Sequence, residues 1–190
     1  MTTVMLFHHA QGLTDGVRWF ADELRSAGHE VTVPDLYEGA TFPTINDGIA
    51  HAQQIGFGEI LARGAAAAAD LPEGAVVGGF SLGGMPAQMI AQTRPGVRGA
   101  VLFHSAIPAT EFGDGWPAEV ALQLHLSAED PLGEEDMAAA KVLAAEAADG
   151  VLFVYPGSGH LIADNSLPEF EPESAALILD RTKEFLARLQ

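Results

Sequence analysis

Short apolar runs alternate with amphipathic stretches along most of the chain. Most of the apolar runs are continuous, as strands buried on both faces of a parallel sheet are. The predicted strands are Val4 to Phe7, Glu30 to Val33, Ala75 to Gly79, Ala100 to His104, Leu122 to Leu126 and Val151 to Tyr155. The predicted helices run from about Thr14 to Ala27, Asp47 to Ala69, Gly83 to Gln92, Glu134 to Ala147 and Pro172 to Leu189. This alternation predicts an α/β fold, with a mostly parallel sheet of about six strands and helices on both faces.

The first predicted helix has the clearest ends. Thr14 and Asp15 stand where an N-cap and an acidic first turn belong, and Gly28 stands where a helix-terminating glycine belongs. The alanine run 65–69 favours the end of a helix over a linker. Because no linker rich in Pro, Gly or Ser divides the chain, residues 1–190 are predicted to form a single domain.

Charge and composition narrow the classes of partner. Acidic residues outnumber Lys and Arg by 26 to 9, so a nucleic acid or an anionic membrane surface is not expected as a partner. The absence of Cys excludes disulfides, thiolate metal sites and a cysteine nucleophile. The N-terminal segment has no basic region, and its apolar stretch is too short for a signal peptide. A cytoplasmic location is therefore the simplest inference. Nothing in the sequence indicates an oligomeric state.

A Gly-x-Ser-x-Gly motif around Ser81 is the first sign of chemistry. It follows a buried-strand pattern and precedes a helical pattern, which is the strand-turn-helix setting of a nucleophile elbow. The alternative is an ordinary glycine-rich turn, which a chain with 21 glycines could contain by chance. The strand-turn-helix context favours Ser81 as a nucleophile.

A serine nucleophile needs a base and an orienting carboxylate. His160 lies in a glycine-rich loop after the last predicted strand, and Asp130 follows the strand before it. Both are therefore expected at the same sheet edge as Ser81, in the chain order Ser, Asp, His that α/β-hydrolases use. Glu129 is the rival to Asp130; Asp136 and Asp114 are weaker rivals, better explained as a helix start and a surface loop.

The oxyanion of the reaction needs two backbone donors. The amide of Leu82 is the first candidate, and register along the turn after the first strand suggests Ala10 as the second. His8 and His9 are adjacent, so in an extended segment they point opposite ways, and no spaced carboxylate or Cys completes a metal site. No metal is expected. His104 and His125 lie at or next to the ends of predicted strands and are interpreted as packed, hydrogen-bonded histidines.

The chain resembles the dienelactone hydrolase family, in the short form frequent in actinobacteria. The resemblance covers nearly the whole chain and rests on segments 8–13 (HHAQGL), 34–39 (PDLYEG), 79–83 (GFSLG) and 156–160 (PGSGH). It implies a compact α/β-hydrolase with no large lid and no cofactor. The implied triad is Ser81, Asp130 and His160, with oxyanion donors from Ala10 and Leu82.

Two departures from the family bear on the substrate. The founding members use a Cys nucleophile where this chain has Ser81, and the turn that often carries a Glu facing the nucleophile has His9 here. His9 is therefore a candidate substrate-binding residue. Relatives that take a carboxylate-bearing lactone hold it with Arg side chains, for which Arg63 and Arg18 are candidates.

The leading hypothesis is a serine esterase or lactonase acting on a small-molecule ester or lactone. Trp116 is a candidate wall residue of its acyl pocket, although an aromatic residue there also fits the core. Loops such as 109–117 are expected to set the shape of that pocket. The alternative hypothesis is a binder of small ligands that has the same fold and little or no catalysis.

Overall fold

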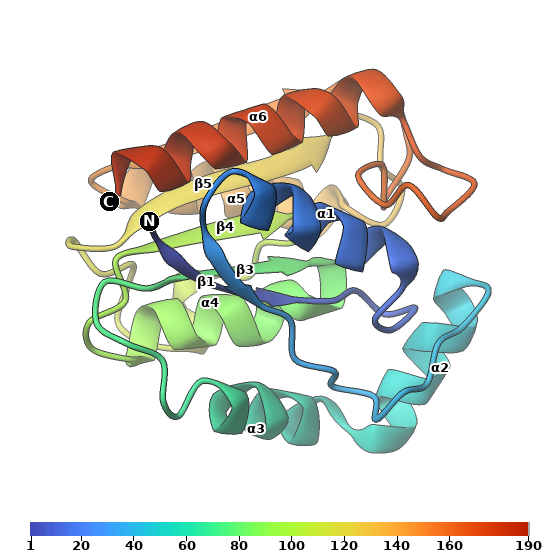
Figure 1. Cartoon of the computed structure of the whole chain (residues 1–190), viewed down its shortest axis with the longest axis horizontal. Coiled ribbons are helices and arrows are strands. Elements are labelled where there is room, and N and C mark those ends of the chain that lie inside the picture. Colours follow the sequence, from blue (N-terminus) through green and yellow to red (C-terminus); the bar gives the residue numbers. More distant parts are fainter. Residues whose placement is uncertain (190) are drawn as a thin grey trace.

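A six-stranded sheet forms the centre of the molecule (Figure 1). The structure, a computed structural model, describes residues 1–189. All neighbouring strands are parallel, in the order β2-β1-β3-β4-β5-β6. The strands are β1 (Thr3–Phe7), β2 (Glu30–Thr32), β3 (Val76–Phe80), β4 (Gly99–Phe103), β5 (Ala121–Ser127) and β6 (Gly150–Tyr155). The predicted α/β class with a parallel sheet of six strands is confirmed, and the strand boundaries predicted from the sequence differ from these by one residue at most.

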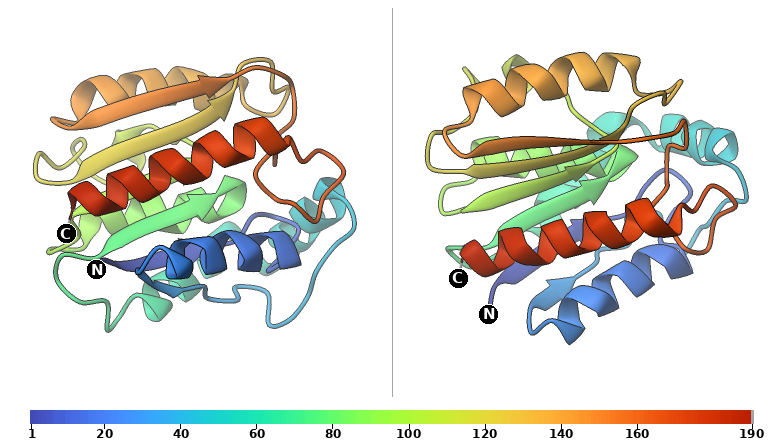
Figure 2. Two further views of the ribbon diagram at one scale, coloured as in Figure 1. Left: turned by 45° about the horizontal axis from the view of Figure 1, so that its top comes forward. Right: turned by 90° about the horizontal axis from the view of Figure 1, so that it is seen from above.

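Helices cover both faces of the sheet (Figure 2). On one face lie α1 (Asp15–Ser26) and α6 (Pro172–Arg188). On the other lie α2 (Ile45–Ile55), α3 (Phe57–Ala67), α4 (Gly84–Thr93) and α5 (Glu134–Glu146). Two short 3-10 helices, η1 (Ser81–Gly83) and η2 (Ala109–Glu111), precede α4 and follow β4. Within residues 1–189, no helix has the length and hydrophobicity needed to cross a membrane.

Successive side chains of a strand enter opposite cores, which explains the continuous apolar runs. In β1, Val4 and Leu6 pack with residues of α1 and α6, whereas Met5 and Phe7 pack with residues of α2, α3 and α4. All four side chains are nearly inaccessible to solvent. A strand buried on both faces has no solvent-exposed face, so the periodicity of two that marks half-exposed strands is absent.

One predicted helix is wrong: the segment 47–69 forms two helices. Gly56 separates α2 from α3 with a φ of 92°, a left-handed conformation that glycine adopts readily. The break turns α2 away from α3, so that Ile45 and Ile49 of α2 face the site described below. The predicted N-cap of α1 is present, because the Thr14 hydroxyl accepts a hydrogen bond from the amide of Val17.

Candidate active site

Ser81 lies on a sharp turn between β3 and α4. Its φ of 48° is in the left-handed region, which is uncommon for a residue with a side chain. The turn is possible because Gly79 and Gly83, two residues before and after Ser81, have no Cβ. A Cβ at Gly79 would collide with the backbone of Gly83, and one at Gly83 would collide with the backbone of Phe7 and His8 at the end of β1. The glycines of the motif therefore let the backbone segments approach each other closely, and this backbone holds Ser81 in place.

Ser81, His160 and Asp130 form a continuous chain of hydrogen bonds. The Ser81 hydroxyl lies 2.7 Å from Nε2 of His160, and Nδ1 of His160 lies 2.6 Å from Oδ2 of Asp130. With the proton on Nδ1, His160 donates to the carboxylate and accepts from the hydroxyl, as a general base must. The structure thus brings together the three residues that the sequence grouped by their order and by their positions after predicted strands.

Asp130 is held as a carboxylate by its neighbours. Burial by itself raises the pKa of Asp130, but the hydrogen bond and charge of His160 and the amide of Leu132 lower the pKa below its ordinary value. The rivals lie elsewhere: Glu129 and Asp114 are exposed, and Asp136 sits in the first turn of α5, where its Oδ1 accepts from the amide of Ala106. Of the four acids, only Asp130 bonds to His160.

The two predicted oxyanion donors differ in their position. Leu82 lines the cavity at Ser81, directly after the nucleophile candidate. Ala10 is buried in the turn after β1, which touches the elbow through the contact between His8 and Gly83. The next amide, that of Gln11, donates to Nδ1 of His9, whereas the amide of Ala10 has no acceptor within residues 1–189. The assignment of Ala10 remains a prediction.

The cavity at Ser81 has a volume of about 320 Å³. Apolar side chains from α2, α4 and the loops after β4 and β5 form much of its wall. Its lining residues are Ile45, Ile49, Ser81, Leu82, Met85, His104, Ser105, Ile107, Leu132, Asp136 and His160. None of them is Lys or Arg, and within residues 1–189 no group of three or more His, Cys, Asp or Glu could hold a metal ion.

His9 does not line this cavity, so its prediction as a substrate-binding residue is corrected. Its side chain is fully buried and its Nε2 lies 2.8 Å from Oδ2 of Asp164. The same carboxylate accepts from the Thr14 hydroxyl and from the amide and hydroxyl of Ser166. These bonds join the turn after β1, the start of α1 and the loop that carries His160. His9 is therefore a structural residue, held by a partner 155 positions away.

Asp164 is the residue that the sequence interpretation missed. Its sequence signal is a carboxylate directly after the apolar run 161–163, since a buried acid requires partners. Burial raises the pKa of Asp164, but the hydrogen bonds from His9, Ser166 and Thr14 lower it below its ordinary value. The carboxylate is thus charged and bonded on both oxygens.

Replacing Asp164 by Asn is expected to lower the free energy of unfolding by about 2 kcal/mol, the contribution of hydrogen bonds to a charged acceptor. The cause is that an amide NH₂ would face groups that donate to the carboxylate. Urea unfolding at pH 7.5 measures the change. The control is Asp22→Asn, which affects an exposed ion pair with Arg25 and should change the free energy by less than about 0.5 kcal/mol. Equal effects of the two variants would contradict a structural role for Asp164.

Trp116 is also absent from the cavity wall. Its ring is buried in the core on the α2–α5 side of the sheet, and its Nε1 donates to the carbonyl of Val120 at 2.8 Å. The prediction that it contacts the substrate is therefore corrected: the indole forms a hydrogen bond within the loop before β5. The two arginine candidates are no better placed. Arg63 bonds to the carbonyl of Leu36 and pairs with Glu59 and Glu38, and Arg18 is exposed on α1.

His104 lines the cavity and has unusual surroundings. It follows β4 with a φ of 52°, and it is buried with its ring centroid 5.8 Å from that of His160. Neither of its ring nitrogens has a hydrogen-bond partner within residues 1–189, which differs from the bonded histidine expected from the sequence. Burial, reinforced by the nearby His160, lowers the pKa of His104 to about 3. His125 does fit the expectation, since both its nitrogens are bonded.

Comparison with known proteins places the chain in a family. The model of the dienelactone hydrolase family matches residues 1–190. No curated protein matches the chain.

Several solved structures share the fold. A dienelactone hydrolase-like promiscuous phosphotriesterase from metagenomic libraries is 19% identical, with a TM-score of 0.78 over 100% of this chain and 87% of that one. A dienelactone hydrolase from Anabaena variabilis is 18% identical, with a TM-score of 0.69 over 98% and 86% of the two chains. An esterase from Pyrobaculum calidifontis is 14% identical, with a TM-score of 0.67 over 100% and 76%. The chain belongs to the dienelactone hydrolase family and is a hydrolase with the α/β-hydrolase fold.

Proposed function

We propose that this protein is a serine hydrolase that cleaves a small ester or lactone through an acyl-enzyme on Ser81. The observation that carries the proposal is the hydrogen-bond chain from Asp130 through His160 to Ser81, with distances of 2.6 and 2.7 Å. Distances in this range are those at which a base can remove the proton of a hydroxyl nucleophile. The cavity that opens beside Ser81 supplies room for a small substrate.

The first half of the reaction forms the acyl-enzyme. Ser81 Oγ attacks the ester carbonyl carbon while Nε2 of His160 takes the hydroxyl proton. Asp130, kept ionised by its lowered pKa, stabilises the imidazolium and holds the ring with Nδ1 protonated. Negative charge develops on the carbonyl oxygen, where the amides of Leu82 and Ala10 are the proposed donors. His160 then gives the proton to the leaving alkoxide as the C–O bond breaks.

The second half restores the enzyme. A water molecule loses a proton to His160 and attacks the acyl carbon, and the proton returns to Ser81 Oγ as the acid product leaves. Each step uses a group of the protein or a water molecule, so the proposed cycle requires no cofactor.

Covalent labelling tests the proposal directly. A fluorophosphonate is expected to add one phosphonyl group to the protein, and peptide mapping by mass spectrometry should place it on Ser81. The reagent phosphonylates a serine only when its hydroxyl is activated, so His160→Gln should lose the label together with Ser81→Ala. An unlabelled wild-type protein, in a mixture where a known serine hydrolase is labelled, would exclude the acyl-enzyme mechanism.

A further inference from the structure

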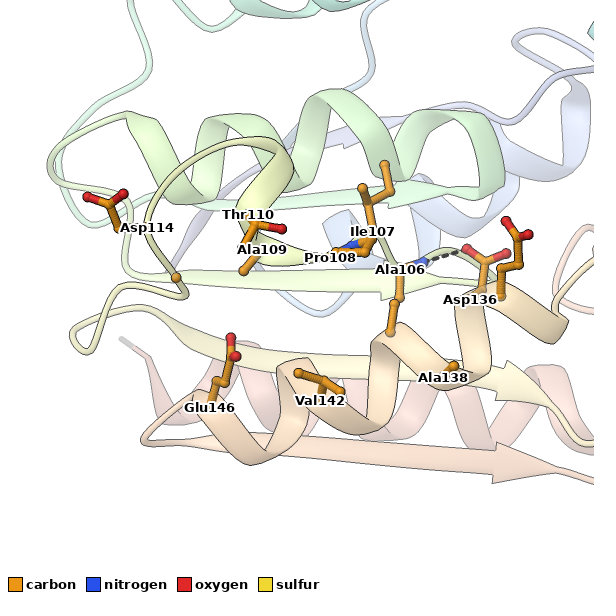
Figure 3. Close-up of a pocket in the computed structure, with 13 residues that line it drawn as sticks. Ala106, Ile107, Pro108, Ala109, Thr110, Asp114, Asp136, Ala138, Val142 and Glu146 are labelled. Carbon is orange, nitrogen blue, oxygen red and sulfur yellow. Dashed lines mark hydrogen bonds between the residues drawn. The ribbon is translucent and has the colours of Figure 1, made fainter.

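A second cavity, drawn in Figure 3, shares lining residues with the one at Ser81. It has a volume of about 670 Å³ and lies between the loop after β4 and helix α5. Many of its lining residues are small or apolar. They are Ala106, Ile107, Pro108, Ala109, Thr110, Asp114, Gly115, Glu135, Asp136, Ala138, Ala139, Val142 and Glu146. We call this cavity the α5 groove.

The α5 groove and the Ser81 cavity meet at two shared residues. Ile107 and Asp136 line both cavities, one from the loop after β4 and the other from α5. A hydrogen bond of 2.7 Å from the amide of Ala106 to Asp136 Oδ1 links loop and helix at this junction, as the dashed line in Figure 3 shows. The two cavities therefore adjoin at this junction.

The loop that forms one wall is held in place by α4. The side chain of Gln88 bonds to both backbone groups of Ile107, donating to its carbonyl and accepting from its amide at 2.6 and 3.0 Å. Gln92 donates to the carbonyls of Ala109 and Gly115. These bonds fix both ends of the wall from a helix that begins just after the nucleophile turn. The groove is thus a preformed part of the site, as ligand pockets usually are.

Charge restricts what the groove can take. Its ionisable lining residues are all acidic: Asp114, Glu135, Asp136 and Glu146. In Figure 3, Asp114 and Glu146 lie at the end of the groove away from Asp136, so acids stand at both ends. No Lys or Arg lines the groove or the Ser81 cavity. A carboxylate in this space would be repelled and would find no side-chain cation to pair with.

We propose that the α5 groove binds the uncharged, apolar group of an open-chain ester whose carbonyl is at Ser81, and that it rejects esters carrying a free carboxylate on that group. This inference rests on the proposed function and adds the class of substrate to it. The apolar lining favours a hydrocarbon chain, and the acidic lining disfavours a negative charge on that chain.

The first test measures how kcat/KM depends on chain length. Two series are compared: p-nitrophenyl esters from acetate to hexanoate, which lengthen the acyl side, and acetate esters from ethyl to hexyl, which lengthen the alcohol side. In at least one series, kcat/KM should rise about two- to fourfold per methylene, the factor expected for burying it. A flat profile in both series would overturn the proposal.

A matched pair of variants on one helix localises the effect. Ala138→Trp places an indole in the groove, whereas Ala145→Trp makes the same change at an exposed α5 position that does not line it. In the series that responds to chain length, the ratio of kcat/KM for the six-carbon ester to that for the two-carbon ester should fall at least tenfold in Ala138→Trp. The ratio should stay at the wild-type value in Ala145→Trp. Equal ratios in the two variants would overturn the proposal.

The second test measures charge selection. The substrates are the six-carbon ester of the series that responds to chain length and its analogue with a terminal carboxylate. For the acyl side these are p-nitrophenyl hexanoate and the mono-p-nitrophenyl ester of adipic acid, and for the alcohol side hexyl acetate and 6-acetoxyhexanoate. At low ionic strength the neutral ester should be preferred by at least about tenfold, and added salt should narrow the preference by screening. Glu146→Lys should shift it toward the carboxylate analogue at least about threefold. Glu184→Lys makes the same change in net charge at an exposed position on α6, and it should leave the preference for the neutral ester unchanged.

The result separates this inference from the function on which it rests. Absence of Ser81-dependent turnover of p-nitrophenyl acetate would remove the proposed function itself. Ser81-dependent acetate turnover, combined with equal rates for the neutral ester and its carboxylate analogue in the series that responds to chain length, would leave the proposed function standing and overturn the groove's role.

Discussion

Replacing Ser81 by Ala is expected to lower kcat for p-nitrophenyl acetate by at least about 10³-fold, because the variant has no atom to form the acyl-enzyme. The variant should still fold. Alanine is smaller than serine at a partly exposed position, and the left-handed turn is imposed by the surrounding glycines rather than by the hydroxyl. Steady-state kinetics and a thermal melt of the same preparation measure both quantities.

The control for this variant is Ser26→Ala, which makes the same change at the exposed end of α1 and should leave kcat within about twofold. His160→Gln is expected to match Ser81→Ala, since the two residues act as one unit and their losses do not add. A rate for Ser81→Ala within tenfold of the wild type would contradict the role of Ser81 as nucleophile. It would favour the alternative hypothesis, in which this cavity binds a ligand without catalysis by Ser81.

Lowering the pH from 8 to 5.5 is expected to reduce the free energy of unfolding by about 4 kcal/mol, through three buried histidines. Burial lowers the pKa of His8 to about 4 and that of His104 to about 3, and it lowers the pKa of His125 well below its ordinary value. The unfolded chain takes up these protons near pH 6.5, whereas the folded chain does not. Stability is therefore complete above pH 6.5 and falls as the pH decreases, by about 1.4 kcal/mol per unit for each group.

Hydrogen bonds show why His8 and His125 stay neutral. Nδ1 of His8 bonds to the carbonyl of His9, so Nε2 is the acceptor for the amide of Leu36 and has no room for a second proton. In His125 one nitrogen faces the hydroxyl of Tyr155 and the other the amide oxygen of Gln123. Protonation of either ring would break one of these bonds or bury an uncompensated charge.

Urea unfolding at several pH values between 8 and 5.5 measures this decline, in a range above the titration of ordinary carboxylates. His104→Asn isolates one of the three contributions, because Asn tolerates the left-handed conformation at this position and does not titrate. The variant should lose about 1.4 kcal/mol of the pH-dependent change, whatever its stability at pH 8. A free energy of unfolding that stays constant between pH 8 and 5.5 would show that these rings are not held neutral.

The sequence predicted the strands and placed Ser81, Asp130 and His160 at one edge of the sheet, because both predictions depend on short-range patterns with a strong physical basis. A parallel strand buried on both sides leaves an apolar run that few other elements produce, and its carboxyl end is fixed once the run is found. Asp130 and His160 each follow a predicted apolar strand within a few residues. Their meeting with Ser81 then follows from the parallel arrangement, which places all three turns at one edge of the sheet.

The features that the sequence did not predict depend on distant partners. His9 is adjacent to the predicted oxyanion turn, but its side chain direction is set by Asp164, which no local pattern links to it. Trp116 was assigned to the pocket on residue type alone, and an indole serves equally well in a core. The break at Gly56 was missed because a single glycine within an otherwise helical pattern is often tolerated.

The wall of the α5 groove formed by residues 106–115 belongs to a turn that supplies none of the proposed reacting groups. Ser81 follows β3, Asp130 follows β5 and His160 follows β6, whereas this wall follows β4 and is anchored by Gln88 and Gln92 of α4. Insertions or substitutions at the tip of this loop can therefore accumulate while the reacting atoms keep their positions. On the proposed function, substrate range in this scaffold can evolve separately from the bond-breaking step, and a library confined to 108–114 is expected to alter ester preference.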